Sequence, residues 1–174
     1  MDERSTVKFP RGAERAALFA ARRARLRYTP PRPAIQPQAA QDLNRGGTVP
    51  VKGIGVDVVK VERIKESLER FGARMEQRLF TEHELEYCRR HRDPLPHFAA
   101  RFAAKEAAFK AIGTGLSGGV GWKQAEVIQP GGRQPELRFS GIALERFRAL
   151  GCTASHVSLS HDAGLAVACV VLEG

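Results

Sequence analysis

Asp57 is an acidic residue in the middle of an apolar segment. It lies between Val56 and Val58, and residues 53–59 have the β-branched content and punctuating glycines of a short buried strand. Aspartate is depleted in strands, and a charge in an apolar setting is costly unless it is paired or bound to a metal. Position alone leaves two interpretations: a functional carboxylate, or an aspartate that caps the turn after the strand.

Glu106 is the second acidic residue in an unexpected place, one turn before Lys110 on a long helix predicted over residues 97–112. Alanines lie beside Glu106 on the helical wheel, and such small side chains let another backbone approach closely, so Glu106 could be held against a neighbouring strand. The alternative is a solvent-facing Glu106–Lys110 pair at i,i+4 spacing, worth only ~0.3–0.5 kcal/mol.

One carboxylate from a strand and one from a helix would suit Mg²⁺, which keeps several waters and binds substrate phosphates. Phosphate contacts would then come from nearby lysines and from a glycine-flanked threonine, namely Lys105, Lys110, Gly113, Thr114 and Gly115. The alternative is an ordinary helix C-terminus, where lysines complement the helix dipole and a glycine ends the helix.

The elements that must position these side chains follow from the apolar pattern. We expect helices over residues 61–71, 81–91, 97–112 and 142–150, and strands over residues 53–59, 125–129, 136–139, 156–160 and 165–172. Gly72 is predicted to end the first helix, and Thr81 to open the second with a capping box. His161 lies in the turn between the last two strands, where a histidine is more often solvated than functional. Because helices and strands are interspersed without regular βαβ alternation, the expected class is α+β.

The first 48 residues differ in composition from the rest. The chain of 174 residues has a net charge of +9 and a pI of about 10.1, but residues 1–50 hold 10 basic and 4 acidic residues, against 18 and 15 in residues 51–174. Residues 1–48 also contain five of the ten prolines. We therefore expect a disordered basic extension over 1–48 and one folded domain over 49–174. An organellar transit peptide and an upstream start codon are the alternatives for the extension.

Cysteine usage and hydropathy bear on the compartment. Cys88, Cys152 and Cys169 are widely spaced without a CxxC pair, so we expect reduced thiols and a cytoplasmic protein rather than a disulfide framework or a zinc site. No segment approaches the ~18 apolar residues that span a membrane, so we expect no membrane partner. Because most of the basic excess lies in the first third, we also expect no nucleic-acid partner.

Three segments together resemble the holo-acyl-carrier-protein synthases, the compact bacterial type of 4′-phosphopantetheinyl transferase. Residues 53–59 read GIGVDVV, residues 101–111 read RFAAKEAAFKA, and residues 156–161 read HVSLSH. Each is similar to one signature of that family, in the same order. The resemblance covers residues 51–174 and nothing before them.

The resemblance implies a fold and a reaction. The fold would be a long helix packed on a small, mainly antiparallel sheet. The reaction is the transfer of 4′-phosphopantetheine from coenzyme A to a serine of apo acyl carrier protein, releasing adenosine 3′,5′-bisphosphate. Asp57 and Glu106 would bind Mg²⁺, and Glu106, directly or through a metal-bound water, would take the serine proton.

The resemblance also implies contacts to coenzyme A. Lys110 would face its phosphates with support from Lys105, Arg101 would bind the cofactor, and His161 would lie near its 3′-phosphate. The glycine-flanked segment 113–115 would complete the site.

The family further implies two protein partners. Its members are homotrimers with coenzyme A between subunits, and they dock the acidic carrier protein of fatty acid biosynthesis on basic residues of the helix after the first strand. Arg63 and Arg70 lie within about 20° of each other there, and Arg74 would join them if the helix continued past Gly72. Two other functions remain as alternatives: a nucleic-acid-binding module that uses the basic extension, and an inactive structural subunit of a synthase complex.

Overall fold

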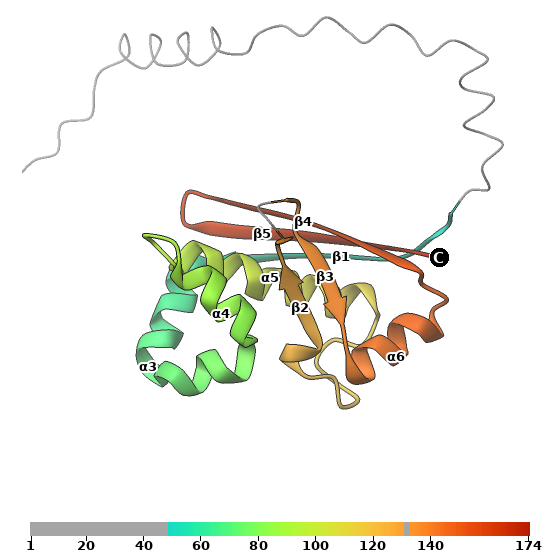
Figure 1. The fold of residues 1–174 in the computed structure, drawn as a ribbon, viewed down its shortest axis with the longest axis horizontal. Helices are drawn as coiled ribbons and strands as arrows, with labels where there is room; N and C mark the ends of the chain where they lie inside the picture. Colours follow the sequence, from blue (N-terminus) through green and yellow to red (C-terminus); the bar gives the residue numbers. More distant parts are fainter. Residues whose placement is uncertain (1–48, 131–132) are drawn as a thin grey trace, which may run out of the picture. The chain divides into compact units, whose positions relative to one another are not determined.

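A three-stranded antiparallel sheet carries Asp57. The structure is a computed structural model that describes residues 49–130 and 133–174, so the extension predicted over 1–48 lies outside the described residues. The sheet consists of β1 (Val51–Lys60), β5 (Leu165–Glu173) and β4 (Ala154–Asp162), in the order β1-β5-β4 (Figure 1). Asp57 pairs with Ala168 of the central strand.

Helix α5 (Leu95–Ala111) packs along one face of this sheet, and glycine and alanine make the contact close. A Cβ atom on Gly55 would lie 1.8 Å from the carbonyl oxygen of Ala107, and one on Gly53 would lie 2.2 Å from that of Ala111. Only glycine therefore fits at these two positions of β1. The alanines predicted beside Glu106 are the side chains that permit this approach.

Helix α3 (Val61–Leu79) is longer than predicted. The first helical segment ends at Gly72, as predicted, where the backbone is non-helical at φ 54° and ψ −141°, and a second helical segment continues across this kink to Leu79. Only glycine adopts this conformation readily. Met75 and Leu79 pack against the core, which gives the second segment a reason to stay helical.

Helix α4 (Glu82–Arg89) begins with the predicted capping box. The Glu84 backbone N–H donates to Thr81 Oγ1 at 3.3 Å, and the Thr81 N–H donates to Glu84 Oε2 at 2.9 Å. The following helix α5 starts at Leu95, two residues before the predicted start, because Pro96 is tolerated in a first helical turn.

The remaining elements form a second, smaller layer. The 3₁₀-helix η1 (Trp122–Gln124) leads into the antiparallel hairpin β2 (Ala125–Ile128) and β3 (Glu136–Phe139), followed by α6 (Gly141–Ala149). In Figure 1, α3 and α4 lie at one end of the long strands and α6 lies at the other. The α+β class and the long helix on a small antiparallel sheet are confirmed. Within the described part of the chain, no helix is both long and apolar enough to cross a membrane.

Candidate active site

Asp57 and Glu106 come together where β1 and α5 touch. The Asp57 side chain is 17% exposed, and Glu106 is half-buried. Burial raises the pKa of the Glu106 carboxyl, and the nearby charge of Asp57 raises this pKa further, while Lys110 and Arg63 act in the opposite direction. Two acidic groups from different elements thus share one electrostatic site.

Lys110 reaches across to β1 rather than along its own helix. Its Nζ donates to Asp57 Oδ1 at 2.9 Å and to the Val56 carbonyl at 3.0 Å. The Lys110 amine is half-exposed, so it bridges this site to solvent. The geometry therefore differs from the alternative of a solvent-facing Glu106–Lys110 pair.

The donor set fits a magnesium ion. Mg²⁺ is usually held by one or two carboxylates, with waters and substrate phosphates as further ligands, and Asp57 and Glu106 supply two carboxylates from facing elements. In residues 49–130 and 133–174, no group of three or more His, Cys, Asp and Glu residues could hold a metal ion. These residues therefore form no all-protein cage of that kind, and a magnesium ion here would be held by the two carboxylates together with water and substrate phosphates.

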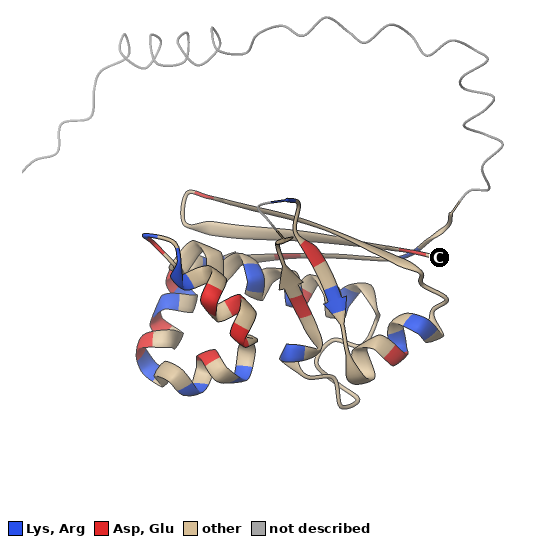
Figure 2. Ribbon diagram, viewed as in Figure 1, with Lys and Arg blue, Asp and Glu red and all other residues tan. Residues whose placement is uncertain are grey.

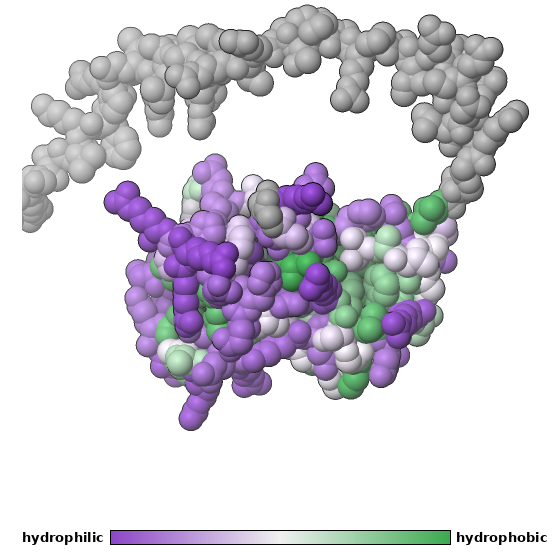
Figure 3. All heavy atoms as spheres, viewed as in Figure 1, coloured by the Kyte–Doolittle hydropathy of each residue, from purple (hydrophilic) through white to green (hydrophobic). Residues whose placement is uncertain are grey.

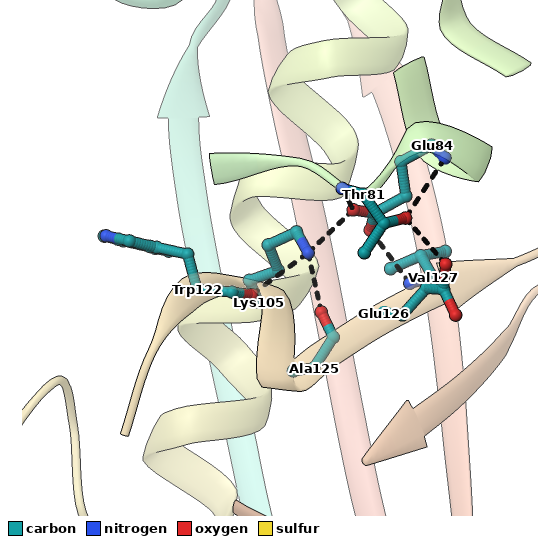
Figure 4. Close-up of polar contacts among 7 residues, drawn as sticks. All are labelled: Thr81, Glu84, Lys105, Trp122, Ala125, Glu126 and Val127. Atoms are coloured by element: carbon teal, nitrogen blue, oxygen red, sulfur yellow. Dashed lines mark hydrogen bonds and ion pairs between the residues drawn. The ribbon is translucent and has the colours of Figure 1, made fainter. Parts of the chain in front are cut away.

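Lys105 occupies a different place from the one expected. Its side chain is fully buried, and its Nζ contacts Glu84 Oε2 at 2.8 Å and donates to the carbonyls of Trp122 at 3.1 Å and Ala125 at 2.7 Å (Figure 4). An ammonium group has three donors, and these three contacts use them all. The expectation that Lys105 contacts phosphates is not met, because its charge points into the core.

Glu84 is the buried partner that explains this position. Its Oε2 also accepts from the Thr81 N–H, and its Oε1 accepts from the Val127 N–H at 2.9 Å. Burial lowers the pKa of Lys105, and the Glu84 carboxylate opposes this. The Glu84–Lys105 pair thus connects α4, α5 and β2. Lys105 directly precedes Glu106 in the sequence. Sequence reasoning placed Glu84 in a capping box but missed this second role.

Arg101 is buried beside a group of aromatic rings. Its side chain is 2% exposed, and its guanidinium carbon lies 3.7 Å from the centre of the Tyr87 ring. Its Nε and Nη2 atoms are buried without a hydrogen-bond partner among the described residues. Buried polar atoms are nearly always paired, so these two unpaired nitrogens call for an explanation.

Three histidines accompany Arg101, and only one of them was expected. The His91 and His97 rings stack with centroids 3.6 Å apart, and the His97 and His161 rings meet edge-to-face at 5.4 Å. Burial lowers the pKa of His97 to about 4, with further lowering by His91, His161 and Arg101. His91 and His97 had no signal in the sequence, because the turn between α4 and α5 brings them together.

The segment after α5 has the geometry of an ordinary helix end. The backbone N–H of Gly113 donates to the Lys110 carbonyl at 3.0 Å, and those of Thr114 and Gly115 donate to the Phe109 carbonyl at 3.2 Å. These three donors are therefore used within the chain. The phosphate contacts expected from residues 113–115 stay a prediction.

A groove of about 320 Å³ lies between α3, α5 and η1. Its apolar lining consists of Ile64, Phe71, Met75, Leu79, Phe102 and Trp122. Arg63, Arg74 and Arg78 line it as well, so the kink at Gly72 brings Arg63 and Arg74 to one groove. Arg70 does not line it; its guanidinium carbon lies 5.0 Å from the Phe71 ring centre. Figure 2 shows the basic and acidic residues interspersed along α3.

An α+β domain that pairs a strand carboxylate with a helix carboxylate and a lysine is built for phosphate chemistry. Residues 53–170 match the family model of the 4′-phosphopantetheinyl transferase superfamily. The holo-[acyl-carrier-protein] synthase of Koribacter versatilis (strain Ellin345) is 48% identical over 124 residues, which are 71% of this chain and 98% of that protein. The chain therefore belongs to the 4′-phosphopantetheinyl transferase superfamily.

Two solved structures agree with this assignment. The holo-[acyl-carrier-protein] synthase of Neisseria meningitidis is similar with a TM-score of 0.65 and 32% identity, over 72% of this chain and 100% of that chain. The Helicobacter pylori holo-[acyl-carrier-protein] synthase in complex with coenzyme A is similar with a TM-score of 0.61 and 28% identity, over 68% of this chain and 98% of that chain.

Proposed function

We propose that this protein transfers 4′-phosphopantetheine from coenzyme A to a serine of apo acyl carrier protein, in a Mg²⁺-dependent reaction. The observation that carries the proposal is the meeting of Asp57 and Glu106 beside Lys110, in a chain of this superfamily. The names of the relatives and the coenzyme A complex of one of them support the same substrates.

The bond changes define what the site must do. The serine Oγ forms a bond to the phosphorus that carries pantetheine, the bond from that phosphorus to the bridging oxygen breaks, and adenosine 3′,5′-bisphosphate leaves. Negative charge develops on the leaving oxygen, and the serine must lose its proton. A bound Mg²⁺ held by Asp57 and Glu106 would supply charge neutralisation at the diphosphate.

Glu106 is the base that we assign, directly or through a water. Burial raises the pKa of this carboxyl in the metal-free chain, and in the proposed reaction the carboxylate takes the serine proton. Lys110 is held by Asp57 at the edge of the site, and its half-exposed amine is available to a phosphate oxygen. Arg101 and His161 are assigned to the 3′-phosphate of coenzyme A.

Carrier docking is assigned to the basic residues of α3. Arg63 and Arg74 line the groove beside α5, and Arg70 lies on the same helix. Acyl carrier proteins are acidic, and opposite charge speeds the encounter of two proteins and is screened by salt.

A homotrimer is part of the proposal. The face of the large sheet opposite α5 is apolar yet open to solvent, with Ile54, Val56, Val58, Leu165 and Val167 all exposed. Contiguous exposed apolar residues of this kind mark association sites. By contrast, hydrophilic residues dominate the surface over α3 and α4 (Figure 3).

We place the reaction in the cytoplasm, in fatty acid biosynthesis. The three cysteines are free, and two of them, Cys88 and Cys152, are buried. Burial raises the pKa of the Cys88 thiol to about 12, which keeps it protonated and unreactive. These thiols are consistent with a reducing compartment.

The test is to incubate the full chain with coenzyme A and apo acyl carrier protein, with and without Mg²⁺. The carrier is expected to gain the mass of one phosphopantetheinyl group, and an equal amount of adenosine 3′,5′-bisphosphate is expected, both only with the metal. An inactive subunit gives neither product. A nucleic-acid-binding module gives neither product and binds duplex DNA in a way that depends on residues 1–48.

A further inference from the structure

The rings of His91, His97 and His161 form one continuous contact, here called the histidine stack. His91 and His97 lie nearly parallel, at an angle of 26°, and His161 approaches His97 edge-on from the end of β4. Tyr87 of α4 touches both His91 and His97, at 4.8 and 6.0 Å between ring centres. The stack is open to solvent on the side of His161, which is exposed.

Arg101 gives the histidine stack the character of an anion site. It is buried beneath Tyr87, its charge acts on His97, and two of its nitrogens have no partner in the described part of the chain. A permanently charged guanidinium that has two unpaired nitrogens and lies next to three titratable rings favours a negatively charged ligand. Coenzyme A carries a diphosphate and one further phosphate, and Asp57 and Glu106 already face the diphosphate in the proposed function.

We infer that the histidine stack is a proton-linked specificity element for the 3′-phosphate of coenzyme A: binding of this phosphate is accompanied by uptake of a proton by the stack. This inference rests on the proposed function. It predicts that the preference for coenzyme A over 3′-dephospho-coenzyme A falls as the pH rises.

The groups around His97 explain the coupling. It is faced by Tyr87 from α4, by His91 and Asp93 from the turn before α5, by Arg101 from α5, and by His161 from β4. The positive charges of His91, His161 and Arg101 lower the pKa of His97. The negative charge of Asp93 raises this pKa. A phosphate dianion reverses this balance, because it attracts the proton that Arg101 repels.

The sign of the pH effect follows from this balance. A histidine whose pKa is raised by the bound phosphate takes up a proton on binding, so affinity is highest below the pKa of the complex and falls as pH rises through it. The stacked rings share one proton rather than two, since two imidazolium ions in contact repel each other. One linked proton changes a binding constant by at most about tenfold per pH unit.

Calorimetry with the full chain, without carrier protein so that no transfer occurs, tests the inference. Dissociation constants are measured for coenzyme A and for 3′-dephospho-coenzyme A at pH 6.5, 7.5 and 8.5. The two ligands share the diphosphate, so the ratio of their constants isolates the 3′-phosphate. The 3′-phosphate loses its second proton near pH 6, and its greater negative charge then strengthens binding as pH rises. This effect is opposite in sign to the fall in affinity that proton uptake by the histidine stack predicts.

The expected result is that the ratio in favour of coenzyme A falls at least about threefold between pH 6.5 and 8.5. The variants His97→Phe and His91→Gln are expected to flatten this trend, while His83→Gln, which changes an exposed histidine of α4, leaves it intact. Repeating the titration at pH 7.5 in two buffers of different ionisation enthalpy is expected to show proton uptake for coenzyme A only.

Two results overturn the inference while leaving the proposed function in place. One is a ratio that does not change with pH although both ligands bind; the other is an unchanged trend in both His97→Phe and His91→Gln. Failure of the chain to bind either ligand overturns the proposed function, and the inference with it.

Discussion

Replacing Lys105 by methionine is expected to destabilise the protein strongly. The substitution leaves the Glu84 carboxylate fully buried without its counter-ion, and it removes the donor from the Trp122 and Ala125 carbonyls. Breaking a buried ion pair by removing one partner costs about 3–5 kcal/mol. Against a total stability of roughly 5–15 kcal/mol this is a large fraction, and it corresponds to a fall in Tm of about 10–20 °C.

The assay is urea unfolding followed by circular dichroism, with two reference variants. Lys123→Met removes an exposed lysine of η1 and is expected to unfold like the wild type. The double variant Lys105→Met/Glu84→Gln replaces the stranded charge by a neutral amide, so it is expected to recover roughly 2 kcal/mol of the loss. The buried-pair interpretation is refuted if the free energy of unfolding of Lys105→Met lies within about 1 kcal/mol of the wild-type value while its affinity for coenzyme A is weakened. That result would favour a contact between Lys105 and a phosphate.

The other predictions concern catalysis, docking and the extension. In the metal-free chain, burial and Asp57 raise the pKa of Glu106, so its carboxyl is expected to titrate above the ordinary pKa of about 4.3 for glutamate; an NMR titration of that carboxyl without Mg²⁺ checks this, and a lower midpoint contradicts it. Arg63→Glu and Arg70→Glu are each expected to raise the KM for the carrier several-fold, with the affinity for coenzyme A unchanged, and the wild-type KM for the carrier should climb with salt; an equal loss of coenzyme A affinity removes α3 from the docking surface. A chain that begins at Val49 is expected to match the Tm and turnover of the full chain, because the composition of residues 1–48 offers little to a core. A clear drop in Tm on truncation would show otherwise.

Local patterns predicted the elements well. The capping box at Thr81 depends on residues three positions apart, so it is visible in the sequence and is confirmed in the structure. Gly72 interrupts the helix as predicted, but the glycine alone does not indicate whether a second helical segment follows it. The outcome depends on whether the following residues, such as Met75 and Leu79, find a core to pack against.

The sequence predicted site residues only where a residue type is unusual for the helix or strand that carries it. Asp57 in a strand and Glu106 among alanines gave such signals, and the structure brings them together. Lys105 was misplaced because its partner Glu84 lies 21 positions away on another helix, and no spacing rule connects them. The histidine stack was missed for the same reason, since a turn and a distant strand assemble it.

In the proposed function Asp57 and Glu106 form the catalytic centre, and the intact mass of the carrier protein measures whether they do. Apo acyl carrier protein is incubated with coenzyme A, Mg²⁺ and the wild type, Asp57→Asn, Glu106→Gln, or Glu86→Gln as a control that changes an exposed glutamate of α4. One added phosphopantetheinyl group is expected with the wild type and the control, and addition at least about a hundredfold slower is expected with Asp57→Asn and Glu106→Gln at unchanged Tm. Near-normal addition by either the Asp57→Asn or the Glu106→Gln protein would contradict it.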